Sequence, residues 1–329
     1  MSADAKRHDA PLLHVDRLAT HFPVRGNRNK VVRAVDDVTF SIDKGRTLGL
    51  VGESGCGKST CARSIVRIHK PTAGTVALDG QDITRLREPE LMPFRRRMQM
   101  IFQDPYASLN ARMTVRDLLA EPLWAHRIAA SRAEEDELVR EMLDKVGLTR
   151  EHADRYAHEF SGGQRQRLGV ARALILRPEL VICDEPVSAL DVSIQAQIIN
   201  LLRNFQQELG LTYLFIAHDL SLVRYMSDDV GVMYMGKLVE LSEASDIYAN
   251  PLHPYTRGLL ASIPEPNPKL ARLKTGSGLT GDLPSPIDPP PGCRFHTRCP
   301  HAIARCSQQE PPLAEAGPRH AVACFAVAE

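Results

Sequence analysis

A complete phosphate-binding loop constrains this sequence more than any other feature. Residues 52–60 read GESGCGKST and match the pattern G-x-x-x-x-G-K-[ST] in full. The glycines let the backbone curl, so that several N–H groups face phosphate oxygens. We expect Lys58 to reach the β- and γ-phosphates and the Ser59 hydroxyl to ligate Mg²⁺. The other expected nucleotide contacts come from the same loop: Gly52, Ser54, Gly55, Cys56, Gly57 and Thr60.

The flanks of the loop provide the context that this motif needs. An apolar strand is predicted at residues 47–51 and a helix at residues 61–68. The N-terminus of that helix adds the positive end of its dipole to the phosphate site. Cys56 lies near the same helix end and could be a reactive thiolate, but it occupies a variable motif position, which favours an unreactive thiol. The loop therefore predicts a nucleoside triphosphate ligand, without saying what its hydrolysis drives.

Strands and helices alternate along most of the chain. Apolar strands are predicted at residues 98–102, 179–183 and 211–217, and amphipathic helices at 161–176 and 194–209. This alternation indicates an α/β fold with a mainly parallel sheet. Further β-structure is predicted in three N-terminal segments and one later hairpin: residues 12–22, 32–42, 74–80 and 230–241.

Polar residues follow directly on several of these strands. Gln103, the pair Asp184 and Glu185, and His218 each come at a predicted strand end. Ligands of open α/β sheets bind at the carboxyl ends of the strands, so these residues are expected to meet around one nucleotide. Asp184 is expected to hold Mg²⁺, directly or through water, as Ser59 does from the loop. Glu185 is expected to orient the attacking water or to accept its proton.

A second glycine-containing helix start lies between the loop and these carboxylates. Ser161 suits a helix N-cap, and Gly162 and Gly163 allow close backbone approach to an anion before Gln164. Taken alone, this tetrapeptide is a common way to begin a helix.

The order of these motifs resembles that of the ATP-binding cassette (ABC) ATPases across residues 12–250. The motifs are the phosphate loop, Gln103, FSGGQ at residues 160–164, Asp184–Glu185, SALD at residues 188–191 and His218. The resemblance implies an ABC-type P-loop NTPase with a RecA-like core, an antiparallel β subdomain and an α-helical subdomain at about residues 104–176. It also implies that two ATP molecules are sandwiched in a head-to-tail dimer.

The same resemblance implies roles for individual residues. Residues 161–164 would form the signature motif that contacts the γ-phosphate bound by the other subunit, and Asp191 would belong to the dimer-contact loop. Gln103 would sense Mg²⁺ and water and couple to a membrane partner, and His218 would touch the γ-phosphate. Phe22 is the candidate for stacking on adenine, and a core phenylalanine is the alternative interpretation.

Longer motifs narrow the resemblance to ATPase subunits of oligopeptide, dipeptide and nickel importers. They are residues 51–60, 102–110, 187–197 and NPLHPYTR at residues 250–257. The chain is most similar to the second ATPase subunit of such systems, which implies an ATPase that powers peptide import. The implied partners are a related ATPase subunit in a heterodimer, two integral membrane permease subunits and, indirectly, a substrate-binding protein. A homodimer, nickel as cargo, and a soluble non-transport ABC ATPase remain the alternatives.

Charge and hydropathy agree with such a peripheral subunit. The formal net charge is +1, so no basic field for nucleic acid exists at the level of the whole chain. No run of 18 apolar residues is present, so the pore must come from other chains. We therefore expect the protein at the cytoplasmic face of the bacterial inner membrane.

The last part of the chain differs in composition. We predict a nucleotide-binding domain at residues 1–250 and a C-terminal extension at 251–329. Residues 251–300 contain eleven prolines, which disfavour a sheet, so we expect an extended appendage wrapped on the surface, with a disordered tail as the alternative. Four of the seven cysteines lie there: Cys293, Cys299, Cys306 and Cys324. Their spacing alone leaves a metal site and unrelated thiols open. The resemblance favours a structural [4Fe–4S] cluster, with zinc as the alternative and His296, His301 and His320 as substitute ligands.

Overall fold

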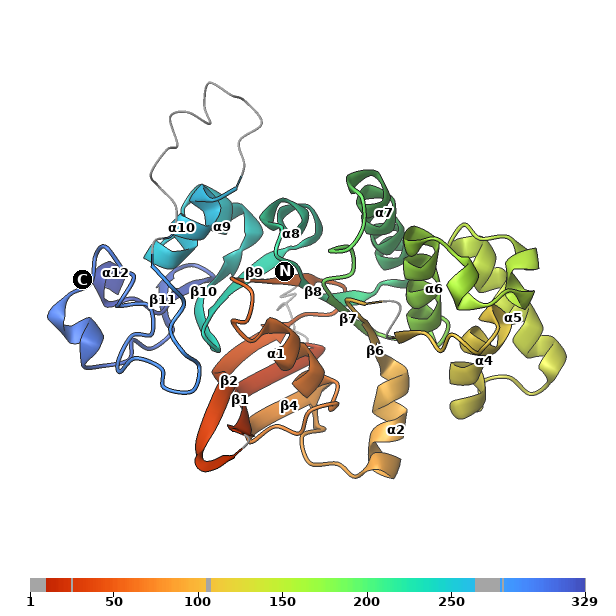
Figure 1. Cartoon of the computed structure of the whole chain (residues 1–329), viewed down its shortest axis with the longest axis horizontal. Helices are drawn as coiled ribbons and strands as arrows, with labels where there is room; N and C mark the ends of the chain where they lie inside the picture. The colour runs from red at the N-terminus through yellow and green to blue at the C-terminus, as the bar shows by residue number, and fades with distance from the viewer. Residues whose placement is uncertain (1–9, 25, 105–107, 264–278, 280, 329) are drawn as a thin grey trace, which may run out of the picture.

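The computed structural model describes residues 10–24, 26–104, 108–263, 279 and 281–328. Two β-sheets occupy the middle of the molecule, a group of helices lies at one end, and the C-terminal segment lies at the other (Figure 1). Two predicted segments lie partly outside the described residues: the motif at 102–110, at residues 105–107, and much of the proline-rich stretch.

The smaller sheet is antiparallel and has the strand order β2-β1-β4-β5. Its strands are β1 (Leu13–Val24), β2 (Asn27–Ile42), β4 (Ala73–Leu78) and β5 (Gln81–Asp82). In the central strand, Val15 lies opposite Phe40 on one side and Val76 on the other, and all three are buried. This apolar face packs against helix α1 (Lys58–Ile65), which follows the phosphate loop.

The larger sheet has eight strands in the order β11-β12-β10-β9-β3-β8-β7-β6. They are β3 (Thr47–Val51), β6 (Met98–Ile101), β7 (Leu180–Asp184), β8 (Thr212–Ile216), β9 (Asp229–Tyr234), β10 (Lys237–Glu243), β11 (Ala314–Gly317) and β12 (His320–Val322). The strands from β9 through β3, β8 and β7 to β6 are parallel neighbours, which confirms the predicted α/β class. Every residue of β3, β7 and β8 is buried, as expected where helices cover both faces of a parallel sheet.

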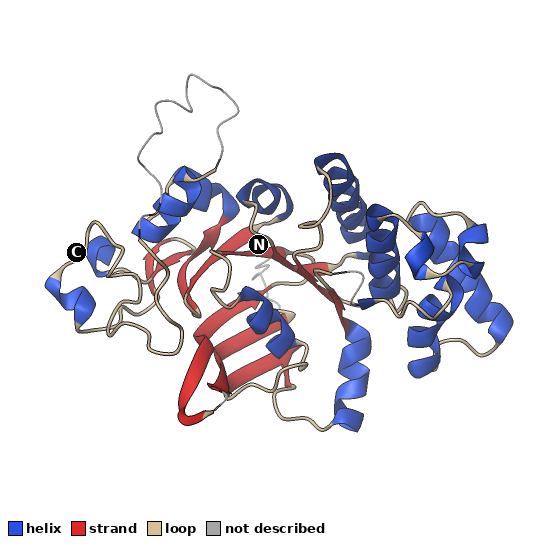
Figure 2. Cartoon of the chain, in the orientation of Figure 1, coloured by secondary structure: helices blue, strands red, loops and turns tan. Residues whose placement is uncertain are grey.

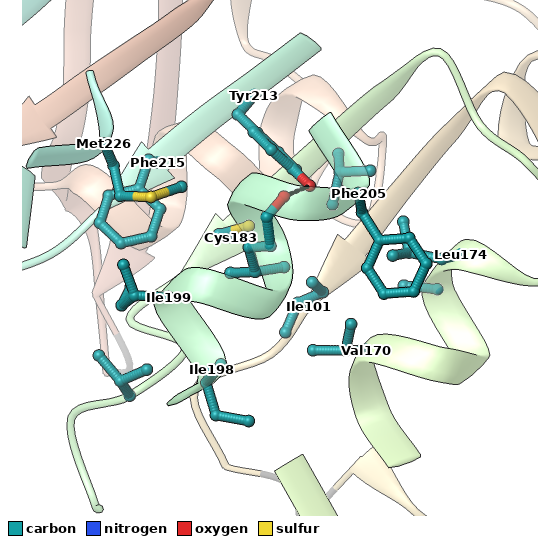
Figure 3. Packing of buried hydrophobic residues seen from close by; sticks show 14 of the residues in the cluster. Ile101, Val170, Leu174, Cys183, Ile198, Ile199, Phe205, Tyr213, Phe215 and Met226 are labelled. Carbon is teal, nitrogen blue, oxygen red and sulfur yellow. Dashed lines mark hydrogen bonds between the residues drawn. The ribbon is translucent and has the colours of Figure 1, made fainter. Parts of the chain in front are cut away.

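Figure 2 shows helices on the flanks of this sheet. One face packs against α6 (Gly162–Leu174), α7 (Val192–Leu209) and α8 (Leu220–Met226). In Figure 3, side chains from these helices meet the strands in one buried cluster, and Tyr213 of β8 donates a hydrogen bond to the Leu202 carbonyl at 2.8 Å. The predicted long helix at residues 194–209 corresponds to α7.

A separate helical group lies at one end of the molecule (Figure 1). It contains α4 (Val115–Ala125), α5 (Arg132–Lys145) and α6, and two short 3-10 helices, Arg150–Asp154 and Ala157–Glu159, lie between α5 and α6. Each α-helix begins with a capping hydroxyl, because Thr114, Ser131 and Ser161 accept hydrogen bonds from backbone N–H groups of the first turn. Arg116 of α4 forms ion pairs with Glu135 and Asp136 of α5 and so fixes these two helices together.

The C-terminal extension contributes to both the main sheet and the main core. It contains α10 (Pro254–Ala261), the 3-10 helix Ala304–Ser307, β11, β12 and α12 (Phe325–Ala328), and α9 (Ala244–Ala249) precedes it. After the prolines, β12 pairs with β10 and extends the main sheet, while Tyr255 and Phe295 are buried in the main core. The buried carboxylate of Glu240 accepts hydrogen bonds from the backbone N–H groups of Leu252 and His253 and contacts His320 Nε2 at 2.7 Å. Much of residues 251–300, for which a surface appendage is predicted, lies outside the described residues, so that prediction stays a prediction, although Tyr255 and Phe295 within it are buried.

Candidate nucleotide-binding and catalytic site

The phosphate loop connects β3 to α1 in a shape that needs glycine. Gly52, Gly55 and Gly57 have φ angles of 151°, 79° and 108°, in the region that L side chains rarely adopt. A Cβ at Gly52 would overlap the Met233 carbonyl oxygen, and one at Gly57 would overlap that of Ala34. The loop is therefore held by close backbone packing on β9 and β2.

Lys58 lies inside the curve of this loop. Its side chain is buried, and Nζ donates hydrogen bonds to the carbonyl oxygens of Gly52 at 2.7 Å and Glu53 at 3.1 Å. Nζ also lies 3.6 Å from Cys56 Sγ. Burial raises the pKa of the Cys56 thiol, which agrees with an unreactive packing role. The loop thus places one cation where phosphate oxygens would bind.

Ser59 and Asp184 form an oxygen-rich pair beneath the loop. Ser59 Oγ donates to Asp184 Oδ1 at 2.7 Å, which joins α1 to the end of β7. Asp184 is fully buried, and its Oδ2 has no hydrogen-bond partner among the described residues, although Arg63 Nη2 lies 3.7 Å away. Burial raises the pKa of Asp184, while the Ser59 hydrogen bond and the Arg63 charge lower it. A buried carboxylate oxygen that accepts no hydrogen bond, beside a hydroxyl, fits Mg²⁺, which prefers hard oxygen ligands and retains water.

Gln103, Glu185 and His218 come together from the ends of three adjacent strands. Glu185 Oε2 accepts a hydrogen bond from Gln103 Nε2 at 2.8 Å and lies 3.6 Å from His218 Nδ1. The Glu185 backbone has φ 48°, a left-handed conformation that is costly for a residue with a side chain. Its N–H donates to the Ile216 carbonyl of β8 at 2.9 Å, which holds this conformation. The strained turn directs the carboxylate toward Gln103 and His218 and away from the course of the strand.

The predicted signature motif does not lie on the phosphate loop of its own chain. Figure 1 shows α6 with the helical group, well apart from α1. Ser161 is exposed and caps α6, and its backbone N–H donates to Gln164 Oε1 at 3.0 Å. Gly162 and Gly163 pack against Leu190 and Ile194, on either side of the exposed Asp191 that begins α7. The motif and Asp191 therefore form one surface, separate from the cluster at Lys58 and Asp184.

Phe22 lies near the end of β1, where its half-buried ring stands nearly perpendicular to the His69 ring at a centroid distance of 5.2 Å. Its role in adenine stacking stays a prediction.

The four C-terminal thiols lie in one region of the extension. The Cys293 N–H donates to the Cys306 carbonyl at 2.8 Å. Burial raises the pKa of Cys293 to about 11, and the other three thiols add to the shift. Yet residues 281–328 and the rest of the described chain contain no group of three or more His, Cys, Asp or Glu that could hold a metal ion. The expected iron–sulfur or zinc site is therefore not supported: the thiols share a region without forming a ligand set.

Two further residues contact the phosphate loop and were not predicted. Tyr255 and Arg298 of the C-terminal extension both hydrogen-bond to Glu53. The only sequence signals were their positions, in the segment at residues 250–257 and next to Cys299.

Two family models and many known proteins match this chain. The family described as "ABC transporter" matches residues 35–188, and "Oligopeptide/dipeptide transporter, C-terminal region" matches residues 239–306. The oligopeptide transport ATP-binding protein AppF of Bacillus subtilis is 54% identical over 95% of this chain and 96% of that protein. The oligopeptide transport ATP-binding protein OppF of Escherichia coli is 52% identical over 96% of each chain.

Solved structures of similar fold are ATP-binding cassettes. The dimeric cassette MJ0796, bound to ADP and phosphate after hydrolysis, matches with a TM-score of 0.64 and 27% identity, over 70% of this chain and 98% of that chain. The structure of cbiO1 from Clostridium perfringens, part of an ABC transporter complex, matches with a TM-score of 0.64 and 25% identity, over 80% of this chain and 98% of that one.

Proposed function

Because this chain belongs to the ABC transporter ATPases, in the branch of the oligopeptide transport ATP-binding proteins, we propose that it hydrolyses ATP to power the import of dipeptides or oligopeptides. The observation that carries the proposal is the arrangement of Gln103, Glu185 and His218 beside a complete phosphate loop. Nickel is the alternative cargo.

The site residues divide the work between binding and chemistry. The loop N–H groups and Lys58 bind the phosphates, and α1 contributes its N-terminal dipole. Ser59, Asp184 and Gln103 would hold Mg²⁺, which neutralises charge on the phosphate oxygens when bound. Glu185 orients the attacking water and draws its proton, while Gln103 fixes the Glu185 carboxylate through the 2.8 Å hydrogen bond. His218 lies at the mouth of the site, 61% exposed, where it can donate to the terminal phosphate.

The separation of the signature motif from the phosphate loop supports a composite site. Ser161 and Asp191 are exposed on a different surface from Lys58. We infer that residues 161–164 complete the nucleotide site of a second subunit, in a head-to-tail dimer. A related but distinct ATPase is the proposed partner, and a homodimer is the alternative.

An apolar groove supports a docking site for the membrane subunits. It has a volume of about 430 Å³ and lies between α2 (Glu88–Arg97) with β6 on one side and α4 with α6 on the other. Phe102, next to Gln103, lines it, so an occupant of the groove would contact the strand end that carries a catalytic residue. Ile68, which lines the groove, is 52% exposed. None of the described helices is long and apolar enough to cross a bilayer. We therefore propose two integral permease subunits as partners at the cytoplasmic face of the inner membrane, with a substrate-binding protein acting indirectly.

Co-purification and uptake test this proposal. Tagged protein expressed with both candidate permease subunits should be recovered with them in the membrane fraction. A deletion strain should lose uptake of labelled dipeptides and keep uptake of nickel. A protein that stays soluble beside all candidate pore subunits would instead indicate a non-transport ABC ATPase.

The cofactor prediction for Cys293, Cys299, Cys306 and Cys324 remains a proposal. Its support is the shared position of the four thiols, and the lack of a ligand set among the described residues stands against it. Anaerobic purification followed by iron, sulfide and zinc analysis distinguishes a [4Fe–4S] cluster, zinc and free thiols.

A further inference from the structure

One residue of the phosphate loop is held by two side chains from the far end of the chain. The Glu53 N–H donates to the Tyr255 hydroxyl oxygen at 2.8 Å. The Glu53 carboxylate accepts two hydrogen bonds from Arg298, at 2.7 Å from Nη1 and 3.1 Å from Nη2. Both the backbone and the side chain of Glu53 are thus fixed from the C-terminal extension.

Arg298 and Tyr255 are themselves rigidly placed. The Arg298 side chain is only 5% exposed, and its Nη1 also lies 3.4 Å from the Tyr234 hydroxyl. The hydrogen bonds to Glu53 raise the pKa of Arg298, so its charge is permanent. Tyr255 is fully buried and packs against Tyr234 and Phe295 at ring-centroid distances of 4.7 and 5.4 Å. Aromatic packing of this kind leaves little freedom at either contact.

Glu53 in turn connects directly to Lys58. The Glu53 carbonyl oxygen accepts from Lys58 Nζ at 3.1 Å and from the Cys56 N–H at 3.2 Å. A single residue, Glu53, therefore joins the extension to the cation of the loop and to its central turn. Tyr255 holds the Glu53 N–H in place. This contact therefore also sets the direction of the N–H groups of the loop residues that follow Glu53.

We propose that Arg298 and Tyr255 are positioning residues for the phosphate loop, through which the C-terminal extension shapes the loop before nucleotide binds. This inference rests on the nucleotide function proposed above. Preorganisation of this kind improves binding because less order is lost when the ligand arrives. Neither residue touches the nucleotide in this proposal, and both act through Glu53.

The Tyr255→Phe variant is the primary test, because it removes one hydroxyl and preserves the ring packing. Tyr213→Phe is the matched control: Tyr213 is also fully buried, and its hydroxyl donates to a backbone carbonyl at 2.8 Å, remote from the loop. We expect Tyr255→Phe to raise the dissociation constant for a fluorescent ATP analogue, and the KM for Mg-ATP, about three- to tenfold with kcat little changed. Tyr213→Phe should lower thermal stability comparably and leave both constants at the wild-type value.

A double-mutant cycle tests the ion pair separately. Arg298→Gln and Glu53→Gln should each weaken nucleotide binding, and the double variant should be no weaker than the worse single variant. Arg298→Lys, which keeps the charge but loses the two-pronged contact, should restore part of the affinity. If Tyr255→Phe and Arg298→Gln bind the analogue with dissociation constants within twofold of wild type, the inference is overturned and the proposed function is unaffected. The same holds if Tyr213→Phe loses as much affinity as Tyr255→Phe. Wild-type protein that fails to bind the analogue would overturn the proposed function as well.

Discussion

Replacement of Glu185 by Gln tests the assigned chemistry with the least disturbance of structure. The amide is nearly isosteric, and its oxygen can still accept the hydrogen bond that Gln103 Nε2 donates at 2.8 Å. The backbone at φ 48° is held by the N–H contact to the Ile216 carbonyl, which the substitution leaves in place. We therefore expect a change in unfolding free energy of no more than about 1 kcal/mol.

The effect on hydrolysis should be far larger. A Gln at this position cannot take a proton from water, and loss of a general base costs about 10²- to 10⁴-fold in rate, or roughly 3–5 kcal/mol in the barrier. Nucleotide binding should be unchanged, because Lys58 and the loop N–H groups are untouched. Bound ATP should then accumulate and trap the closed dimer.

Steady-state phosphate release and titration with a fluorescent ATP analogue measure the two effects separately, and size-exclusion chromatography with Mg-ATP detects the trapped dimer. Glu208→Gln, the same substitution at an exposed position of α7, serves as the control and should hydrolyse ATP at the wild-type rate. A Glu185→Gln protein that binds ATP and still turns over within a few-fold of wild type would refute the role of Glu185.

Three further substitutions test other parts of the account. Lys58→Ala should weaken nucleotide binding at least about tenfold, because it removes the one buried cation inside the loop; direct titration checks this. Burial lowers the pKa of His253 to about 4. As the pH falls below about 6.5, His253 is therefore protonated in the unfolded chain but not in the folded one, and the fold loses stability between pH 6.5 and pH 4. In urea unfolding, the free energy of unfolding should fall between pH 7 and pH 5 by about 2 kcal/mol more in wild type than in His253→Asn. The Asn side chain can still accept a hydrogen bond from the Tyr255 N–H. Equal losses in the two proteins would contradict this prediction. Glu240→Ala should destabilise the fold by about 3 kcal/mol or more, because it leaves the buried His253 N–H, the partly buried Leu252 N–H and His320 without their acceptor. An unfolding midpoint close to wild type would count against that anchor.

The sequence predicted those parts of the fold that depend on local pattern. Apolar runs gave the buried strands β3, β7 and β8, and the rule that parallel strands end at one edge predicted the meeting of Gln103, Glu185 and His218. The catalytic roles of these residues stay predictions. Helix α2 was missed because Pro93 lies inside it, and a proline in a helix interior usually argues against a helix.

Other features depend on contacts that no sequence pattern contains. The left-handed turn at Glu185 arises from its hydrogen bond to β8, and the approach of Arg63 to Asp184 arises from the packing of α1 on the sheet. The hold of Tyr255 and Arg298 on Glu53 joins segments about 200 residues apart in the chain. For the four C-terminal cysteines, the sequence suggested a metal site that the described residues do not form, because they contain no group of three or more potential ligands.

Transport by the reconstituted complex tests the central claim most directly. This chain, its partner ATPase and two permease subunits would be placed in proteoliposomes with a substrate-binding protein, and uptake of a labelled dipeptide would be followed with and without Mg-ATP. The account predicts uptake that requires ATP and that is abolished when this chain carries Glu185→Gln. Uptake that proceeds equally without ATP, or that is unaffected by Glu185→Gln, would contradict it.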